Sequence, residues 1–152
     1  MPTPTPQDRQ AWLSTLAKAP ARQLLDAWQH VPTPPDFEWV RPPEFGSVMV
    51  QGRTGSTGDA FHLGEVTVTR CTLRLADGTL GHGYRQGRHK AAAQITALCD
   101  ALLQQGHEPL ASHIAQHVVQ SLAQAQAQAQ QTLREKAAAT KVDFFTLVRG
   151  DD

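Results

Sequence analysis

Two short segments of this 152-residue chain combine glycine with cationic side chains, a pairing that proteins use to hold anions. The first, residues 51–58, reads Gln-Gly-Arg-Thr-Gly-Ser-Thr-Gly. Glycine lets backbone amides approach an anion closely, and an arginine can hold it with a planar fork of donors. The Gly-Lys-Ser/Thr step into a helix that defines a P-loop does not follow. The segment predicts either an anion-binding loop or a glycine-rich hairpin with a solvated arginine, and its candidate ligands are Arg53, Thr54, Gly55, Thr57 and Gly58.

The second segment, residues 81–90, ends where a helical pattern begins. Arg88 and Lys90 flank this helix start, where the helix dipole favours negative rather than positive charge. A bound phosphate, phosphonate or partner carboxylate would offset the conflict. Alternatively, the long side chains extend into water at a cost of about a few tenths of a kcal/mol. Residues 41–90 hold seven basic and four acidic side chains, so this part of a neutral chain has a net positive charge. Arg70, which lies in it, is a further candidate for binding an anion.

Histidine and cysteine give weaker signals. His82, between two glycines, is a candidate acid or base, although the sequence does not show what it faces. His113 and His117 have the i, i+4 spacing of half a metal site, but no strong third ligand follows, so we predict no metal. Cys71 and Cys99 lack a Cys-x-x-Cys partner and are expected to be buried, reduced thiols. No nucleophile elbow or Cys/His arrangement supports nucleophilic catalysis.

The N-terminal third predicts helices. Residues 1–7 alternate proline and threonine, which predicts a flexible arm preceding a single domain over residues 8–152. Helical spacing starts at Asp8 and includes Trp12 and Leu16, and a second helix follows Pro20. The proline-rich residues 30–35 then form a stiff connector.

The hydrophobic period changes from 3.6 to 2 in the middle of the chain. Two strands are expected around residues 37–39 and 48–50, separated by Pro42, Pro43 and Gly46. A longer strand, residues 65–75, alternates apolar with polar positions, and the Asp77-Gly78 pair predicts a tight turn into an antiparallel strand at residues 80–84.

Helical periodicity returns after Gly87. One apolar stripe runs from Ile95 to Leu103 and ends near Gly106, and a second helix carries apolar residues at every fourth position from Leu110. The Ala-Gln run at residues 123–130 extends that second helix, because both residues favour helix over strand. Residues 142–148 are expected to form a strand or an apolar docking segment. The predicted fold class is α+β: an antiparallel β-sheet flanked by helices in a single domain.

Charge and hydropathy restrict the partners. The formal net charge is zero, which argues against non-specific binding to nucleic acid. No stretch approaches the ~20 apolar residues that span a bilayer, and the first residues do not resemble a signal peptide. We therefore expect a cytoplasmic protein without a membrane or nucleic-acid partner.

Five short motifs occur in register along the chain: RTGSTG at 53–58, GEVTVTR at 64–70, DGTLG at 77–81, QGRHK at 86–90 and KVDFFTLVRGD at 141–151. Together they resemble the PhnG family of the bacterial carbon–phosphorus lyase system. Two positions depart from the family pattern: Ser56 replaces a common glycine, and His89 stands where the family commonly has aspartate. Neither side chain is therefore assigned an invariant role.

The resemblance implies a subunit of α-D-ribose 1-methylphosphonate 5-triphosphate synthase, a transferase that acts as a complex rather than through this chain alone. The family works with the sister subunits PhnH, PhnI and PhnL, and the larger assembly contains PhnJ. In this reaction methylphosphonate displaces adenine from ATP at the ribose anomeric carbon. The resemblance implies no cofactor held by this chain, with Mg–ATP and methylphosphonate as substrates of the complex.

Two roles within such a complex remain open. In the first, the chain contributes anion-binding groups beside a catalytic partner, using Arg53, Arg70, Arg88 and Lys90. In the second, it is a structural subunit needed for assembly. Its arginines would then pair with partner carboxylates, and the interface would include Phe144, Phe145 and Arg149. An independent nucleotide-binding domain is a third, weaker interpretation.

Overall fold

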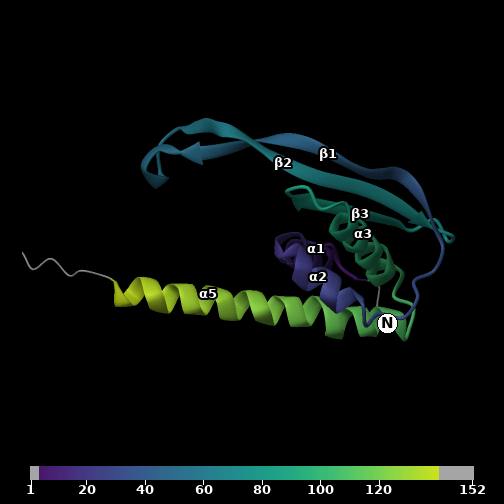
Figure 1. Ribbon diagram of the computed structural model, residues 1–152. Coiled ribbons are helices and arrows are strands. Elements are labelled where there is room, and N and C mark those ends of the chain that lie inside the picture. Colours follow the sequence, from purple (N-terminus) through teal and green to yellow (C-terminus); the bar gives the residue numbers. More distant parts are fainter. Residues whose placement is uncertain (1–3, 141–152) are drawn as a thin grey trace, which may run out of the picture.

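The computed structural model describes residues 4–140, apart from the side chain of Ser56. Within this range the chain forms one α+β domain, a three-stranded antiparallel sheet with helices against one face (Figure 1). This arrangement confirms the predicted fold class. The C-terminal prediction, a strand or docking segment at residues 142–148, lies outside the described residues.

Helices α1 (Pro6–Lys18) and α2 (Ala21–Trp28) form the expected N-terminal pair. Helix α1 begins at Pro6 rather than at Asp8. The reason is a capping box, in which the Thr5 hydroxyl accepts from the Asp8 amide and the Asp8 carboxylate accepts from the Thr5 amide. The last residues of the predicted flexible arm are therefore the cap and first turn of a helix.

Strands β1 (Phe37–Arg53), β2 (Ala60–Leu75) and β3 (Leu80–Gln86) pair in the order β1-β2-β3. The prediction of two strands between residues 37 and 50 was wrong, because β1 is continuous. Its proline pair lies within register shifts between Trp39 and Glu44. Because β1 is an edge strand, its prolines remove few ladder hydrogen bonds and the strand continues past them. The predicted turn into β3 is confirmed, with Gly78 at a φ of 90°.

Helix α3 (Lys90–Gln105) packs against β2 and β3 and supplies much of the core. It ends, as predicted, at Gly106, which adopts a left-handed φ of 68°. Strand β3 lies so close to α3 that a Cβ on Gly81 or Gly83 would come within 2.0 Å of an α3 carbonyl oxygen. The buried core joins these elements to α1, α2 and the helical segment that follows α3, and its apolar members include Leu16, Leu24, Leu73, Leu98, Leu102, Ile114 and Val118.

The described residues from Leu110 onward form one helical rod, made of α4 (Leu110–His113), a π-helical segment η2 (Ile114–Gln120) and α5 (Ser121–Ala139). The Ala-Gln run is helical, as its composition predicts. No helix in the described range 4–140 is apolar and long enough to cross a membrane.

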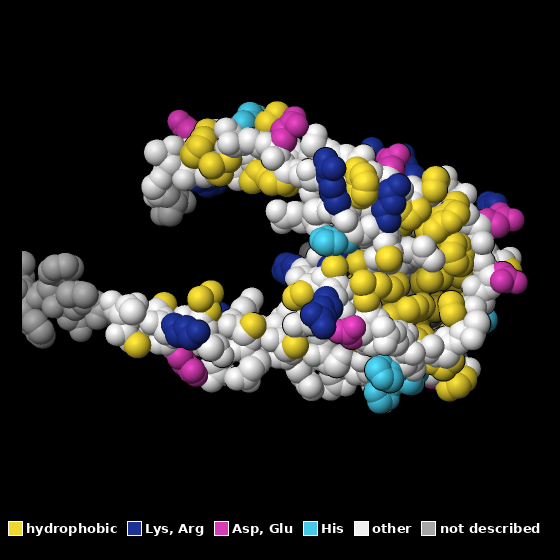
Figure 2. All heavy atoms as spheres, viewed as in Figure 1, with side chains coloured by type: hydrophobic (Ala, Val, Ile, Leu, Met, Phe, Trp, Pro, Cys, Tyr) yellow, Lys and Arg dark blue, Asp and Glu magenta, His cyan; other side chains and the backbone are white. Residues whose placement is uncertain are grey.

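Two parts of the fold extend beyond the packed body on the same side of the molecule (Figure 1). The hairpin arm is residues 47–67, the part of the β1–β2 ribbon beyond the last β2–β3 pair, Val68 with Gln86. The helical arm is residues 127–139 of α5, all of which are exposed. Figure 2 shows an open space between the two arms.

Candidate functional site

The two cations at the start of α3 lie over an aromatic ring. The Arg88 guanidinium carbon is 5.6 Å from the centroid of the Phe45 ring, and Lys90 Nζ is 5.0 Å from it. Such contacts are worth roughly 0.5–1 kcal/mol at exposed sites. The ring face thus offsets part of the unfavourable position of these cations at a helix N-terminus. Both side chains remain exposed, so they can still contact an anion.

Arg70 lies on the sheet face opposite the helices and already has a carboxylate partner. Its Nε donates to Glu44 Oε1 over 2.8 Å, and Arg41 Nε lies 3.8 Å from the same oxygen. The hydrogen bond from Arg70 lowers the pKa of Glu44. An external anion at Arg70 would therefore have to displace or join Glu44. Arg74 on the same face is similarly paired, with Glu38 at 2.8 Å.

Arg53 lies at the tip of the hairpin arm. The turn contains a short 3₁₀ segment (Thr54–Ser56), and Gly55 has a left-handed φ of 58°. Gly58 is needed for space, since a Cβ there would lie 2.4 Å from the Thr54 carbonyl oxygen. The Arg53 guanidinium donates one long hydrogen bond, of 3.4 Å, to the Gly58 carbonyl oxygen. Thr57 is exposed and lies between the 3₁₀ segment and Gly58. The glycines of this loop are therefore explained by turn geometry.

The two predicted cationic segments do not meet within this chain. Arg53 pairs with Ala60, whereas the end of β3 near Arg88 pairs with Val68. Eight strand residues separate these two positions, or about 26 Å at ~3.3 Å per residue. A single small anion cannot contact both segments of one molecule in this structure.

His82 lies on β3 and is exposed on the polar face of the sheet. Its Nδ1 is 3.1 Å from the Thr72 hydroxyl on the neighbouring strand. The flanking glycines, Gly81 and Gly83, face α3 and permit its close packing. The Gly-His-Gly pattern is thus a packing feature, and it leaves the imidazole accessible from the solvent side.

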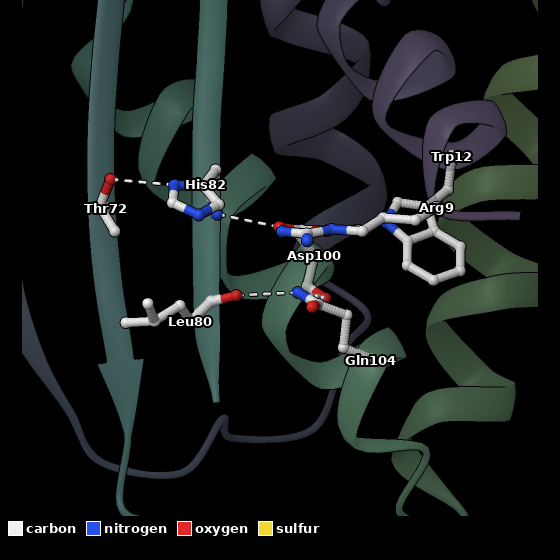
Figure 3. A network of polar contacts seen from close by, with 7 residues as sticks. All are labelled: Arg9, Trp12, Thr72, Leu80, His82, Asp100 and Gln104. Atoms are coloured by element: carbon white, nitrogen blue, oxygen red, sulfur yellow. Dashed lines mark hydrogen bonds and ion pairs between the residues drawn. The ribbon is translucent and has the colours of Figure 1, made fainter. Parts of the chain in front are cut away.

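A buried polar network that the sequence analysis did not predict centres on Asp100 of α3 (Figure 3). Its carboxylate is fully buried and accepts four hydrogen bonds: two from Arg9 (3.0 and 2.8 Å), one from Trp12 Nε1 (3.0 Å) and one from the His82 amide (2.9 Å). The hydrogen bond to Asp100 raises the pKa of Arg9. The network joins α1, α3 and β3. Its signal in the sequence was an aspartate inside an apolar helical stripe.

The cysteines are inert structural thiols, as predicted. Both are free and buried. Burial raises the pKa of Cys71 to about 11 and also raises the pKa of Cys99. Neither therefore has the thiolate character that a nucleophile needs at neutral pH.

The paired histidines also lack a metal-site environment. The ring centroids of His113 and His117 are 4.5 Å apart, and His113 Nε2 lies 3.0 Å from the His30 carbonyl oxygen. Among the described residues, no three His, Cys, Asp or Glu side chains are grouped so that they could hold a metal ion.

The comparison with known proteins covers almost the whole sequence. The family model of phosphonate metabolism protein PhnG matches residues 7–150. The chain belongs to the PhnG family. It is also 42% identical over 146 residues to a Rhizobium meliloti (strain 1021) protein, with 95% of this chain and 90% of that protein covered. That relative is named α-D-ribose 1-methylphosphonate 5-triphosphate synthase subunit PhnG. The resemblance carried by the five sequence motifs is thus confirmed as PhnG family membership.

Proposed function

We propose that this PhnG-family chain is a subunit of α-D-ribose 1-methylphosphonate 5-triphosphate synthase. The observation that carries the proposal is the 42% identity, over nearly the full length of both chains, to a protein of that name. We further propose that it works with PhnH, PhnI and PhnL, and with PhnJ in a larger assembly. Because ATP is a substrate, the assembly belongs in the cytoplasm.

The proposed reaction exchanges one bond at the ribose anomeric carbon. The bond from this carbon to adenine N9 breaks, and a bond to a methylphosphonate oxygen forms, while the triphosphate stays on the ribose. Adenine leaves with the proton that the phosphonate gives up. The transition state has a cation-like sugar between two anionic reactants, so their charge must be neutralised before they can approach. Mg–ATP enters as substrate, and this chain supplies no resident cofactor.

Within that reaction, we assign this chain the role of binding reactant anions beside a catalytic partner. Arg88 and Lys90 support this role, because both are exposed and lie over an uncharged ring rather than a carboxylate. Arg53 has only a carbonyl contact and is also available. Arg70 is a weaker candidate because Glu44 already neutralises it. His82 is placed on the same sheet face as Arg70, where a partner could bring substrate to its imidazole.

A non-catalytic assembly role is the second candidate, and the two arms favour it. Large apolar side chains at Met49, Leu63 and Leu133 are 55%, 64% and 68% exposed. Exposed apolar surface of this kind marks protein–protein contacts. In this role, Phe144, Phe145 and Arg149 would extend the interface, although they lie outside the described residues.

Reconstitution of the complex distinguishes these roles. The four synthase subunits are combined with Mg–ATP and methylphosphonate, and adenine release is measured with the wild-type chain, without it, and with Arg53→Ala or Arg88→Ala. The anion-binding role predicts intact assembly and a raised KM for ATP or methylphosphonate in the variants. Unchanged assembly and turnover in both variants would refute that role, and adenine release without this chain would refute subunit function.

A further inference from the structure

We propose that the pocket between the α1–α2 corner and the end of β3 binds the oxyanion of a phosphate or phosphonate. Its floor and walls include Lys18, Ala19, Pro20, Ala21, Arg85 and His89, and it encloses about 530 Å³. None of these residues belongs to the anion-binding set derived from the sequence. The ligand class rests on the proposed function, since both synthase reactants carry phosphorus oxyanions.

Arg85 is the central observation. Its side chain is 3% exposed and donates to the backbone carbonyls of Leu16 and Ala19 at the end of α1. Its Nε has no hydrogen-bond partner, and no carboxylate of the described residues lies within ion-pair distance of it. A buried cation without a counter-ion is costly, so a site of this kind favours an incoming anion.

Lys18 adds to the positive potential around Arg85. Lys18 and His89 line the same pocket, and no Asp or Glu is among its described lining residues. The carbonyls at the α1 C-terminus carry the negative end of the helix dipole, equivalent to roughly half an elementary charge. They therefore offset only part of the Arg85 charge. Lys18 then leaves the pocket with a clear positive excess. This charge pattern selects an anion over a neutral or cationic ligand.

The start of α2 supplies further donors. Pro20 and Ala21, where α2 begins, line the pocket, and no side chain caps this helix end. The first amides of a helix lack intrahelical acceptors, and the helix dipole makes this end positive. Phosphate and phosphonate present three oxygens in different directions. Their tetrahedral shape can therefore accept from the first amides of α2 and from Lys18 at the same time, while the positive charge of Arg85 lies behind them.

The test is direct binding to the full-length chain. Inorganic phosphate and methylphosphonate are titrated separately by calorimetry at low salt, with the wild type and with Lys18→Gln and Arg85→Lys. Lys136→Gln is the control, because it removes an exposed cation from α5, outside the pocket. Circular dichroism checks that each variant keeps its fold. Because Lys18 is exposed, Lys18→Gln should fold normally. Its affinity for the anion can therefore be measured even where Arg85→Lys fails to fold.

We expect saturable binding of at least one probe by the wild type. Lys18→Gln should weaken it about tenfold, as for the loss of one charge-assisted hydrogen bond. Arg85→Lys should weaken it at least as much, and Lys136→Gln should change it less than about twofold. Absence of saturable binding, or equal losses from Lys18→Gln and Lys136→Gln, would overturn the proposal. This assay needs neither sister subunits nor turnover, so its failure is distinguishable from failure of the adenine-release assay.

Discussion

The packed body and the two arms of this molecule bury their apolar side chains very differently. In the body, α3 lies so close to β3 that only glycine fits at two strand positions, and Leu16, Leu73 and Cys99 are 0% exposed. In the hairpin arm, no described side chain is buried, and the helical arm is exposed throughout. The arms nevertheless carry Met49, Leu63 and Leu133, whose side chains are more than half exposed in this chain.

This difference separates the residues that stabilise the domain from those available to partners. Stability comes from close helix–sheet packing and from the buried Asp100 network. The arms add little apolar burial, and an isolated helical segment as short as the helical arm is marginally stable in water. The exposed apolar side chains of the arms are therefore available to partners, in keeping with the proposed role in a multi-subunit synthase.

The largest expected effect is in the body, at Asp100. Asp100→Ala removes the acceptor of four hydrogen bonds and leaves the Trp12 and His82 donors buried. We expect a loss of about 3–5 kcal/mol in the free energy of unfolding, measured by urea denaturation. A loss below about 1 kcal/mol would show that the network is not what holds α1 to α3 and β3.

The next effect concerns close packing. In Gly83→Ala the new Cβ would lie 2.0 Å from the Ala93 carbonyl oxygen and 2.8 Å from Cys71 Sγ. We expect a destabilisation of about 3 kcal/mol, at the upper end of ordinary overpacking. The matched control is Gly46→Ala at the root of the hairpin arm, where the nearest atoms to a new Cβ are at 3.9 Å. Equal denaturation midpoints for both variants would remove the distinction between body and arm.

The smallest effect on stability should come from the arms themselves. Met49→Ser combined with Leu63→Ser should change the free energy of unfolding by less than about 0.5 kcal/mol, since both side chains are already exposed. The same variant should weaken association with the sister subunits at least tenfold, because each apolar side chain buried in an interface contributes about 1.5–3 kcal/mol. Co-purification and titration of the complex measure this. Unchanged association would place the interface elsewhere.

Local sequence signals predicted most of the fold. Period-2 alternation with Asp77-Gly78 gave the β2–β3 hairpin, and the stripe ending at Gly106 gave α3. The prolines of β1 were misread, because whether a proline breaks a strand depends on its place at a sheet edge and on neighbouring bulges. The start of α1 was misplaced by two residues, although Thr5 and Asp8 formed a recognisable capping pair.

The site was less predictable because its determinants are contacts between distant residues. Arg70 donates to Glu44 on the neighbouring strand, 26 residues away in the sequence. Arg9 donates to Asp100, 91 residues away. Gly81 and Gly83 lie in the second glycine-containing cationic segment, yet the structure shows that their lack of a side chain makes room for α3. The sequence does not distinguish Arg85 from the exposed arginines, because its burial without a counter-ion depends on the folded structure.

Hydrogen–deuterium exchange of the full-length chain, alone and assembled with the sister subunits, tests the central claim most directly. The account predicts that assembly slows amide exchange in the hairpin arm (residues 47–67) and the helical arm (residues 127–139). Exchange in α3, β3 and the core of β2 should be already slow in the free chain and nearly unchanged. Arms that exchange equally fast in both states, with new protection confined to the body, would contradict it.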